Sequence, residues 1–267
     1  MNKKKYFRII KWTLFCYALI GIAFFYLQNY FLFRPVTIPA SQPFSFDQPF
    51  KELLLPYNES TKISIVQFTT KDTAKGVVLY FHGNRTNINR YASANTLFTK
   101  NGYEVWMIDY PGYGKSTGPH KEEMFYEFAL QLYKLARARY QPNQIILYGR
   151  SLGTGIAAQL ASIRDCKQLI LETPYYSFPS IIGSYAPIYP MERMIHFKIP
   201  TWKYLKEVTA PVLILHGTSD WTIPLGNAEK LRPYLKETDQ FRIIEGGAHN
   251  NLWDFEAAKK QIVETLQ

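Results

Sequence analysis

The stretch Gly149-Arg150-Ser151-Leu152-Gly153 decides the fold of this chain. A short, β-branched apolar run (residues 144–148) precedes it, and a run with Ala and Leu at helical spacing (residues 154–161) follows it. This context predicts a buried strand, a sharp turn and a helix. A serine between two glycines at such a junction is the nucleophile-elbow pattern. Ser151 is then exposed at a helix N-terminus, where free N–H groups favour the oxyanion of acyl transfer.

The two glycines of the pattern have a steric explanation. The turn is so sharp that a side chain two residues before or after the serine would collide with the adjoining strand or helix. Gly149 and Gly153 carry no side chain and remove that clash.

Composition and charge limit the class of protein. The chain has 267 residues, 47% of them hydrophobic, which suits one α/β domain plus an extra segment. The formal net charge is +10, but six basic residues precede the first acidic one, and the other 25 Lys and Arg face 21 Asp and Glu without forming runs. We therefore expect no nucleic-acid partner, and the oligomeric state stays open.

Short apolar runs predict the strands of the domain: residues 62–70, 77–81, 104–108, 145–148, 169–171, 212–215 and 241–244. Most are separated by predicted helices over residues 88–100, 121–139, 155–163, 228–235 and 253–266. Apolar strands that alternate with amphipathic helices predict an α/β fold with a mostly parallel central sheet covered by helices on both faces.

Residues 12–33 form an uncharged span. As a helix these 22 residues would extend about 33 Å, enough to cross a hydrocarbon core of roughly 30 Å. Tyr30, Phe31 and Phe33 suit the aromatic belt of a membrane interface. Residues 21–23 match a signal-peptidase site poorly, which favours an uncleaved signal-anchor over a cleaved signal peptide. The basic cluster before the span predicts a cytoplasmic N-terminus and a globular domain on the non-cytoplasmic side.

The predicted organisation has a basic cytoplasmic tail (1–11), a transmembrane signal-anchor (12–33), a linker rich in Pro, Gln, Ser and Phe (34–61) and a globular domain (62–267). Within the domain, residues 175–206 are rich in aromatic side chains and divided by prolines. We expect a short cap insertion there without long helices. The alternative is that these side chains only cover the helices of the sheet.

Two further residues complete a predicted nucleophilic site. A serine nucleophile needs a base, and the base needs an orienting acid. His249 lies in the loop after the last predicted strand, and Asp220 lies in the corresponding loop one strand earlier. Ligand groups of open α/β sheets gather at this edge. We expect Ser151 to be the nucleophile, His249 the base and Asp220 the acid.

The chain resembles the α/β-hydrolase superfamily, and more narrowly its membrane-anchored serine hydrolases. The segments that carry the resemblance are Tyr80-Phe81-His82-Gly83-Asn84, residues 109–116, residues 149–153, Glu172-Thr173-Pro174, residues 216–220 and Gly246-Gly247-Ala248-His249. The resemblance implies the α/β-hydrolase fold and an oxyanion hole made by the backbone N–H groups of Asn84 and Leu152.

Several charged residues near the predicted site have competing interpretations. Asp109 and Glu172 are rival acids, but Asp109 precedes the serine in a stretch that resembles a structural loop of the superfamily. His82 is expected to hold a turn. Arg85 and Arg150 flank the site and either meet an anionic substrate or form salt bridges with the scaffold, the second being favoured. The remaining histidines outside the site are expected at the surface or in packing positions: His120, His196 and His216.

The predicted function is that of a membrane-anchored serine hydrolase that cleaves carboxylic esters or thioesters of a small-molecule acyl substrate, lipid-like if the cap forms an apolar pocket. An amidase or aminopeptidase with the same triad and a non-catalytic scaffold are the alternatives. We expect no metal or other cofactor, because the sequence has no H-E-x-x-H or clustered Cys and His. Gly114-Lys115-Ser116 resembles the end of a phosphate-binding loop but lacks the glycine required five residues earlier.

The one-sided basic cluster yields a prediction about topology. A reporter enzyme that is active only outside the cytoplasm should be active when it is fused after Pro56, because the positive residues hold the N-terminus in the cytoplasm. Activity of a cytoplasm-dependent reporter at the same position, or a mature N-terminus near Phe24, would contradict the signal-anchor.

Overall fold

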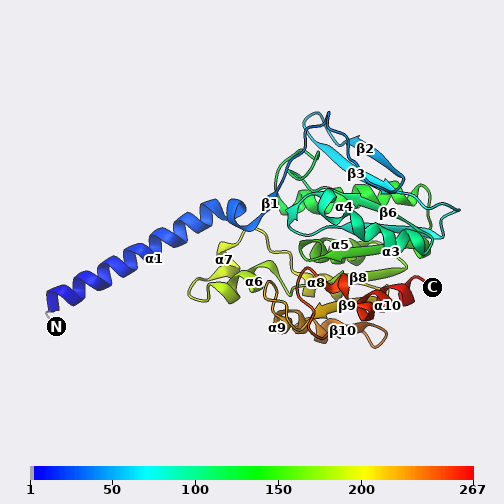
Figure 1. Cartoon of the computed structure of the whole chain (residues 1–267). Coiled ribbons are helices and arrows are strands. Elements are labelled where there is room, and N and C mark those ends of the chain that lie inside the picture. Colours follow the sequence, from blue (N-terminus) through cyan, green and yellow to red (C-terminus); the bar gives the residue numbers. More distant parts are fainter. Residues whose placement is uncertain (1–2) are drawn as a thin grey trace.

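The apolar runs of the sequence pair into one eight-stranded sheet with the order β10-β9-β8-β7-β4-β6-β3-β2 (Figure 1). The structure, a computed structural model, describes residues 3–267. The strands are β2 (Phe50–Pro56), β3 (Lys62–Phe68), β4 (Gly76–Phe81), β6 (Tyr103–Ile108), β7 (Ile145–Arg150), β8 (Gln168–Glu172), β9 (Val212–Gly217) and β10 (Gln240–Ile244). The strands from β10 to β6 run parallel to one another. At the other edge β3 is antiparallel to β6, and β2 is antiparallel to β3.

Helices cover both faces of this sheet, as the alternation of strands and helices predicts. Every side chain of β4 is buried: Val77, Leu79 and Phe81 belong to one core, and Val78 and Tyr80 belong to the other. This split follows from the period of two in a strand. The first core contains α4 (Glu122–Arg137), α5 (Leu152–Ile163) and α8 (Thr201–Leu205), and the second contains α2 (Ile88–Tyr91), α3 (Asn95–Lys100) and α10 (Glu256–Thr265). The predicted fold class is confirmed.

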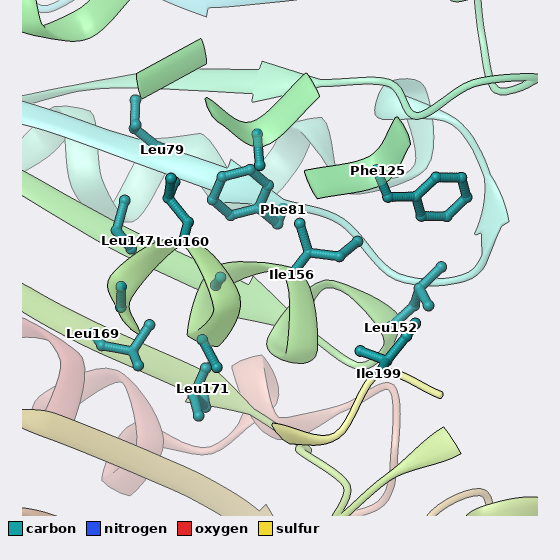
Figure 2. Close-up of a cluster of buried hydrophobic side chains, with 14 of the residues drawn as sticks. Leu79, Phe81, Phe125, Leu147, Leu152, Ile156, Leu160, Leu169, Leu171 and Ile199 are labelled. Carbon is teal, nitrogen blue, oxygen red and sulfur yellow. The ribbon is translucent and has the colours of Figure 1, made fainter. Parts of the chain in front are cut away.

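The first core surrounds α5, the helix that begins directly after Ser151. Figure 2 shows Leu152, Ile156 and Leu160 of α5 against strand residues that include Leu79, Leu147 and Leu171. Because residues 152–158 of this helix are all buried, its N-terminus is fixed relative to β7 and β4.

Two predicted helices are interrupted. Residues 88–100 form α2 and α3 with a 3₁₀ turn at Ala92–Ala94 between them. The predicted helix over residues 228–235 is replaced by α9 (Leu225–Glu229) and a 3₁₀ turn at Arg232–Tyr234. Pro233 accounts for the second break, since its ring and missing N–H do not fit a helix interior.

The predicted linker over residues 34–61 is wrong in part. Phe50–Pro56 is strand β2, which pairs along its whole length with β3 at the edge of the sheet. Its residues are only partly buried, and it carries Lys51 and Glu52. Charged side chains protect an edge strand from pairing with another chain. They also make the sequence of β2 similar to that of a loop. Arg34–Pro35 (β1) also pairs with Arg85–Thr86 (β5) in a separate two-stranded ribbon.

The N-terminal helix α1 (Lys3–Leu32) is long and apolar enough to cross a membrane, and it extends away from the domain (Figure 1). It begins inside the predicted tail of residues 1–11, because Lys and Arg are good helix formers and no breaker precedes the apolar span. Residues 1 and 2 of that tail lie outside the described residues. Phe33 is not part of an aromatic belt: its side chain is buried, with ring centroids 4.5 Å from Phe197 and 5.6 Å from Phe178.

The segment predicted as a cap, residues 175–206, contains the short helices α6 (Phe178–Tyr185), α7 (Met191–Met194) and α8. Pro179 lies in the first turn of α6, and Pro190 and Pro200 directly precede α7 and α8. Helix α8 packs on α5 and covers the sheet, whereas α6 and α7 lie toward α1 (Figure 1). The segment therefore contains both a cap, formed by α6 and α7, and a part that covers the sheet, formed by α8.

Contacts between this segment and α1 are specific. The Tyr17 and Tyr189 rings stack with centroids 4.6 Å apart, and the Tyr17 hydroxyl donates to the Ile188 carbonyl at 2.9 Å. Gln28 is buried, donates to the Met194 carbonyl at 3.0 Å and accepts from the His196 N–H at 2.6 Å. Helix α1 is thus docked on the cap.

Candidate active site

Ser151 lies at the turn between β7 and α5 in a strained backbone conformation, with φ 51° and ψ −118°. A Cβ atom on Gly153 would lie 2.0 Å from the Phe81 carbonyl oxygen, and one on Gly149 would lie 2.5 Å from the Gly153 carbonyl oxygen. The close approach explains why both positions require glycine, as the sequence predicts. The Ser151 N–H donates to the Glu172 carbonyl at 2.9 Å, which ties the turn to β8.

The structure brings Ser151, His249 and Asp220 together in one hydrogen-bonded chain. His249 Nε2 lies 2.9 Å from Ser151 Oγ, and His249 Nδ1 lies 2.8 Å from Asp220 Oδ2. His249 follows β10 and Asp220 follows β9, so both loops lie at the edge of the sheet where β7 ends. With Nδ1–H donated to the carboxylate, Nε2 is left as an acceptor for the serine hydroxyl.

Asp220 is held rigidly. Its side chain is fully buried, and its Oδ1 accepts the backbone N–H groups of Thr222 at 2.9 Å and Ile223 at 2.8 Å. Two N–H donors on one oxygen leave Oδ2 free to accept from His249. The carboxylate is therefore fixed in orientation.

His216, expected at the surface or in a packing position, lies buried beneath this acid. Its Nε2 is 3.6 Å from Asp220 Oδ2 but donates to the Ile223 carbonyl at 2.9 Å. Burial lowers the pKa of His216, against smaller opposing effects of the Ile223 carbonyl and Asp220. A neutral His216 supports the Asp220 loop without competing for the carboxylate.

The two rival acids have structural partners elsewhere. Asp109 is buried, accepts the Ile88 N–H at 2.9 Å and lies 3.3 Å from His82 Nε2. His82 thus packs under the turn, as expected. Glu172 accepts from the Tyr148 hydroxyl and from Trp253 Nε1 and pairs with Arg150.

Asn84 and Leu152, the two residues implied for an oxyanion hole, line the same cavity as Ser151. Leu152 is the first residue of α5, so its N–H has no acceptor within the helix. Asn84 is fixed by its side chain: Nδ2 donates to the Leu32 carbonyl, and Oδ1 accepts from the Tyr113 hydroxyl at 3.0 Å. Sequence reasoning missed this link between the end of α1 and the Asn84 loop, because it joins residues 52 positions apart.

The cavity above Ser151 has a volume of about 540 Å³. Its lining combines the end of α1, the Asn84 loop, the cap and the loops after β9 and β10: Phe31, Leu32, Arg34, Asn84, Arg85, Tyr91, Arg150, Ser151, Leu152, Tyr175, Phe178, Ile181, Ile182, Tyr185, Trp221, Thr222, Ile223, His249 and Asn250. It is mostly apolar on the cap side and carries three arginines. A groove of about 770 Å³ elsewhere runs between α1 and the cap at Ile188 and Tyr189, without Ser151.

The three arginines differ in their partners. Arg150, one of the two expected to flank the site, lies 3.4 Å from Glu172 through Nε and over the Tyr91 ring. Its salt bridge is the scaffold interaction favoured from the sequence. Arg85, the other, and Arg34 are exposed and have no carboxylate within ion-pair distance among residues 3–267.

Several known proteins are similar to this chain in sequence. A family model described as "Serine aminopeptidase, S33" matches residues 72–202. The chain is 31% identical over 183 residues to alpha/beta hydrolase domain-containing protein 17C of Xenopus tropicalis, covering 66% of this chain and 56% of that protein. The Mus musculus protein of the same name is 28% identical over 188 residues, covering 67% of this chain and 56% of that protein. The chain thus spans little more than half the length of these relatives.

Solved structures share the fold at low identity. An esterase from Pyrococcus furiosus has a TM-score of 0.69 at 16% identity and covers 88% of this chain and 96% of its own. A bromoperoxidase from Bacillus anthracis has a TM-score of 0.63 at 16% identity and covers 81% of this chain and 99% of its own. Proteins with different activities share this architecture, so the fold alone does not fix the reaction. The sequence relatives, the sheet and its helices together show that the chain belongs to the α/β-hydrolase superfamily.

Proposed function

We propose that the protein is a membrane-anchored serine hydrolase that cleaves carboxylic esters or thioesters through an acyl-enzyme on Ser151. The observation that carries the proposal is the hydrogen-bonded chain from Ser151 through His249 to Asp220. A binding scaffold has no need for a serine at a strained turn, a base within 2.9 Å of it and a buried acid behind that base.

In the proposed mechanism His249 acts first as a base and then as an acid. Ser151 Oγ attacks the acyl carbon while its proton passes to His249 Nε2, and His249 then gives that proton to the leaving alcohol or thiol. A water molecule, deprotonated by His249, attacks the acyl-enzyme and releases the carboxylic acid and Ser151. Asp220 keeps the imidazole in the required tautomer and stabilises its charged form.

The negative charge of the tetrahedral intermediate would be held by the backbone N–H groups of Leu152 and Asn84. Fixed donors are effective because they need no reorganisation during the reaction. Packing fixes Leu152 at the start of α5, and Asn84 is fixed by its hydrogen bonds to Leu32 and Tyr113. The end of α1 therefore contributes to the position of the proposed oxyanion hole.

The cap side of the cavity suits an acyl chain. Phe178 and Ile181 of α6 are almost fully buried and form an apolar wall with Tyr175 and Ile182. Each buried CH₂ group of a substrate contributes up to about 0.8 kcal/mol. Apolar acyl chains should therefore bind better than acetyl groups.

The contacts with α1 place this cap beside the proposed membrane span. Tyr17, which stacks on Tyr189, lies about 22 Å along the helix from Leu32. At this contact Gln28 and Tyr17 form hydrogen bonds with backbone groups of the cap. Polar groups in an apolar environment require such partners. Trp221, next to Asp220 at the cavity, is 87% exposed, which suits a rim that faces a bilayer.

The family match favours one alternative, an aminopeptidase with the same triad. An aminopeptidase needs a counter-charge for the free amino group of its substrate. Among the described residues, the cavity lining contains arginines but no carboxylate. The charge of the cavity therefore favours neutral or anionic esters and thioesters over peptides with a free amino group.

Replacing Ser151 tests the proposal. Ser151→Ala should abolish labelling by a fluorophosphonate and lower turnover of acyl esters roughly 10⁴-fold or more, because no group replaces the nucleophile. Ser162→Ala, at the other end of α5, should leave both unchanged. A panel of acyl esters and aminoacyl amides separates the alternatives: preference for the amides would favour the peptidase, and labelling that persists in Ser151→Ala would favour the scaffold.

A second substitution tests the acid. Asp220→Asn should fold normally and lower turnover on the order of 10³–10⁴-fold, because an amide does not hold the imidazole in the required tautomer. Asp109→Asn should instead lower the thermal unfolding temperature, since a neutral amide replaces the buried carboxylate that accepts from the Ile88 N–H and faces His82. The assignment is wrong if folded Asp109→Asn protein loses more turnover than Asp220→Asn protein.

A further inference from the structure

Arg34 and Arg85 lie side by side at the mouth of the cavity. The strands β1 and β5 are parallel, and the register pairs Arg34 with Arg85 directly. Both side chains are exposed, and both line the cavity that contains Ser151. Within residues 3–267 neither guanidinium has an acidic partner, whereas Arg150 in the same cavity is paired with Glu172.

This arrangement is unfavourable without an anion. Like charges directly opposite each other on neighbouring strands repel. The repulsion is relieved when an anion lies between them, and a guanidinium fits the oxygens of phosphate especially well through paired hydrogen bonds. Two such groups match the charge of a phosphate monoester, about −1.5 to −2 at neutral pH.

The ribbon that carries the two arginines is fixed relative to the proposed reaction centre. The Arg34 N–H donates to the Asn84 carbonyl at 3.4 Å, and the Val36 N–H donates to the Thr86 carbonyl at 3.0 Å. Arg85 directly follows Asn84, a proposed oxyanion donor. An anion on the arginine pair would therefore belong to a molecule whose acyl bond lies within reach of Ser151.

We infer that Arg34 and Arg85 bind the phosphate group of the substrate, so that the natural substrate is an acyl ester or thioester with a phosphate-bearing leaving group. The inference rests on the proposed hydrolase function and narrows it. The apolar wall of the cap receives the acyl chain, and the arginine pair selects the phosphate group of the leaving group.

The phosphate of a bilayer lipid is the competing ligand for this pair. Arg34 follows α1 by two residues, close to the end of the proposed membrane span, where lipid phosphates lie. If the arginine pair bound only bilayer lipids, turnover would depend on the lipid composition of the membrane and not on the charge of the substrate. The two sources are therefore distinguishable.

The test uses the full chain in phosphatidylcholine nanodiscs and two substrates that share one short acyl chain: the monoacyl ester of glycerol 3-phosphate and the monoacylglycerol. In the double variant Arg34→Gln/Arg85→Gln, kcat/KM for the phosphate ester should fall about 10- to 100-fold, as expected for lost hydrogen bonds to a charged group. For the uncharged ester it should change less than about twofold, because that ester makes no such bond. The loss should shrink with added salt.

Matched variants separate specific binding from the local field. Arg90→Gln removes a nearby exposed charge from α2 that does not line the cavity, and it should leave the preference for the phosphate ester intact. Arg34→Lys/Arg85→Lys should restore part of the preference, since lysine keeps the charge without the paired geometry.

Three results would overturn the inference. In the first, wild-type protein shows no preference for the phosphate ester. In the second, kcat/KM of the Gln variant falls equally for both substrates. In the third, the effect of the Gln variant appears only when phosphatidylglycerol is added to the nanodiscs, equally for both substrates, which would assign the pair to bilayer lipids. Failure of the proposed hydrolase function is separate, since wild-type protein would then hydrolyse neither ester.

Discussion

The close approach of α5 to β4 is the constraint on which the site depends. A Cβ atom on Gly153 would lie 2.0 Å from the Phe81 carbonyl oxygen, so the helix can begin at this place only with glycine. This contact forces Ser151 into its strained turn and aligns the first N–H of α5 with the loop that leaves β4. Asn84, in that loop, is thereby brought to the cavity of Ser151. Backbone packing in the core, rather than flexible side chains, thus positions both the proposed nucleophile and the proposed oxyanion donors.

The N-terminal helix α1 is part of the same arrangement. Its last carbonyl, on Leu32, accepts from the Asn84 side chain, and its Gln28 bonds the cap at Met194 and His196. One helix therefore contacts both the loop of Asn84 and the cap. Gln28 lowers the hydrophobicity of the span over residues 12–33. Its side-chain amide is buried and its hydrogen bonds are satisfied, which explains why a polar residue is tolerated there. In the account proposed above, the anchor also positions the site at the bilayer.

The sequence predicts those features that have local physical causes. Gly149, Ser151 and Gly153 satisfy a steric requirement within five residues, and the buried strands are short apolar runs because helices cover both of their faces. The edge strand β2 escapes prediction because its residues are only half-buried or exposed and because it carries charged side chains. The pairing of Arg34 with Arg85 and the bond between Leu32 and Asn84 join residues about fifty positions apart, so neither has a sequence pattern of its own.

The proposed acyl transfer through Ser151 can be followed in the mass of the reacting protein. The full chain is mixed with an excess of p-nitrophenyl acyl ester, quenched in acid during turnover, digested and analysed by mass spectrometry. We expect an added acyl group on the peptide that contains Ser151, formed as quickly as the first equivalent of p-nitrophenol is released. Turnover with an unmodified Ser151 peptide, or with the acyl group on another residue such as Cys166, would contradict it.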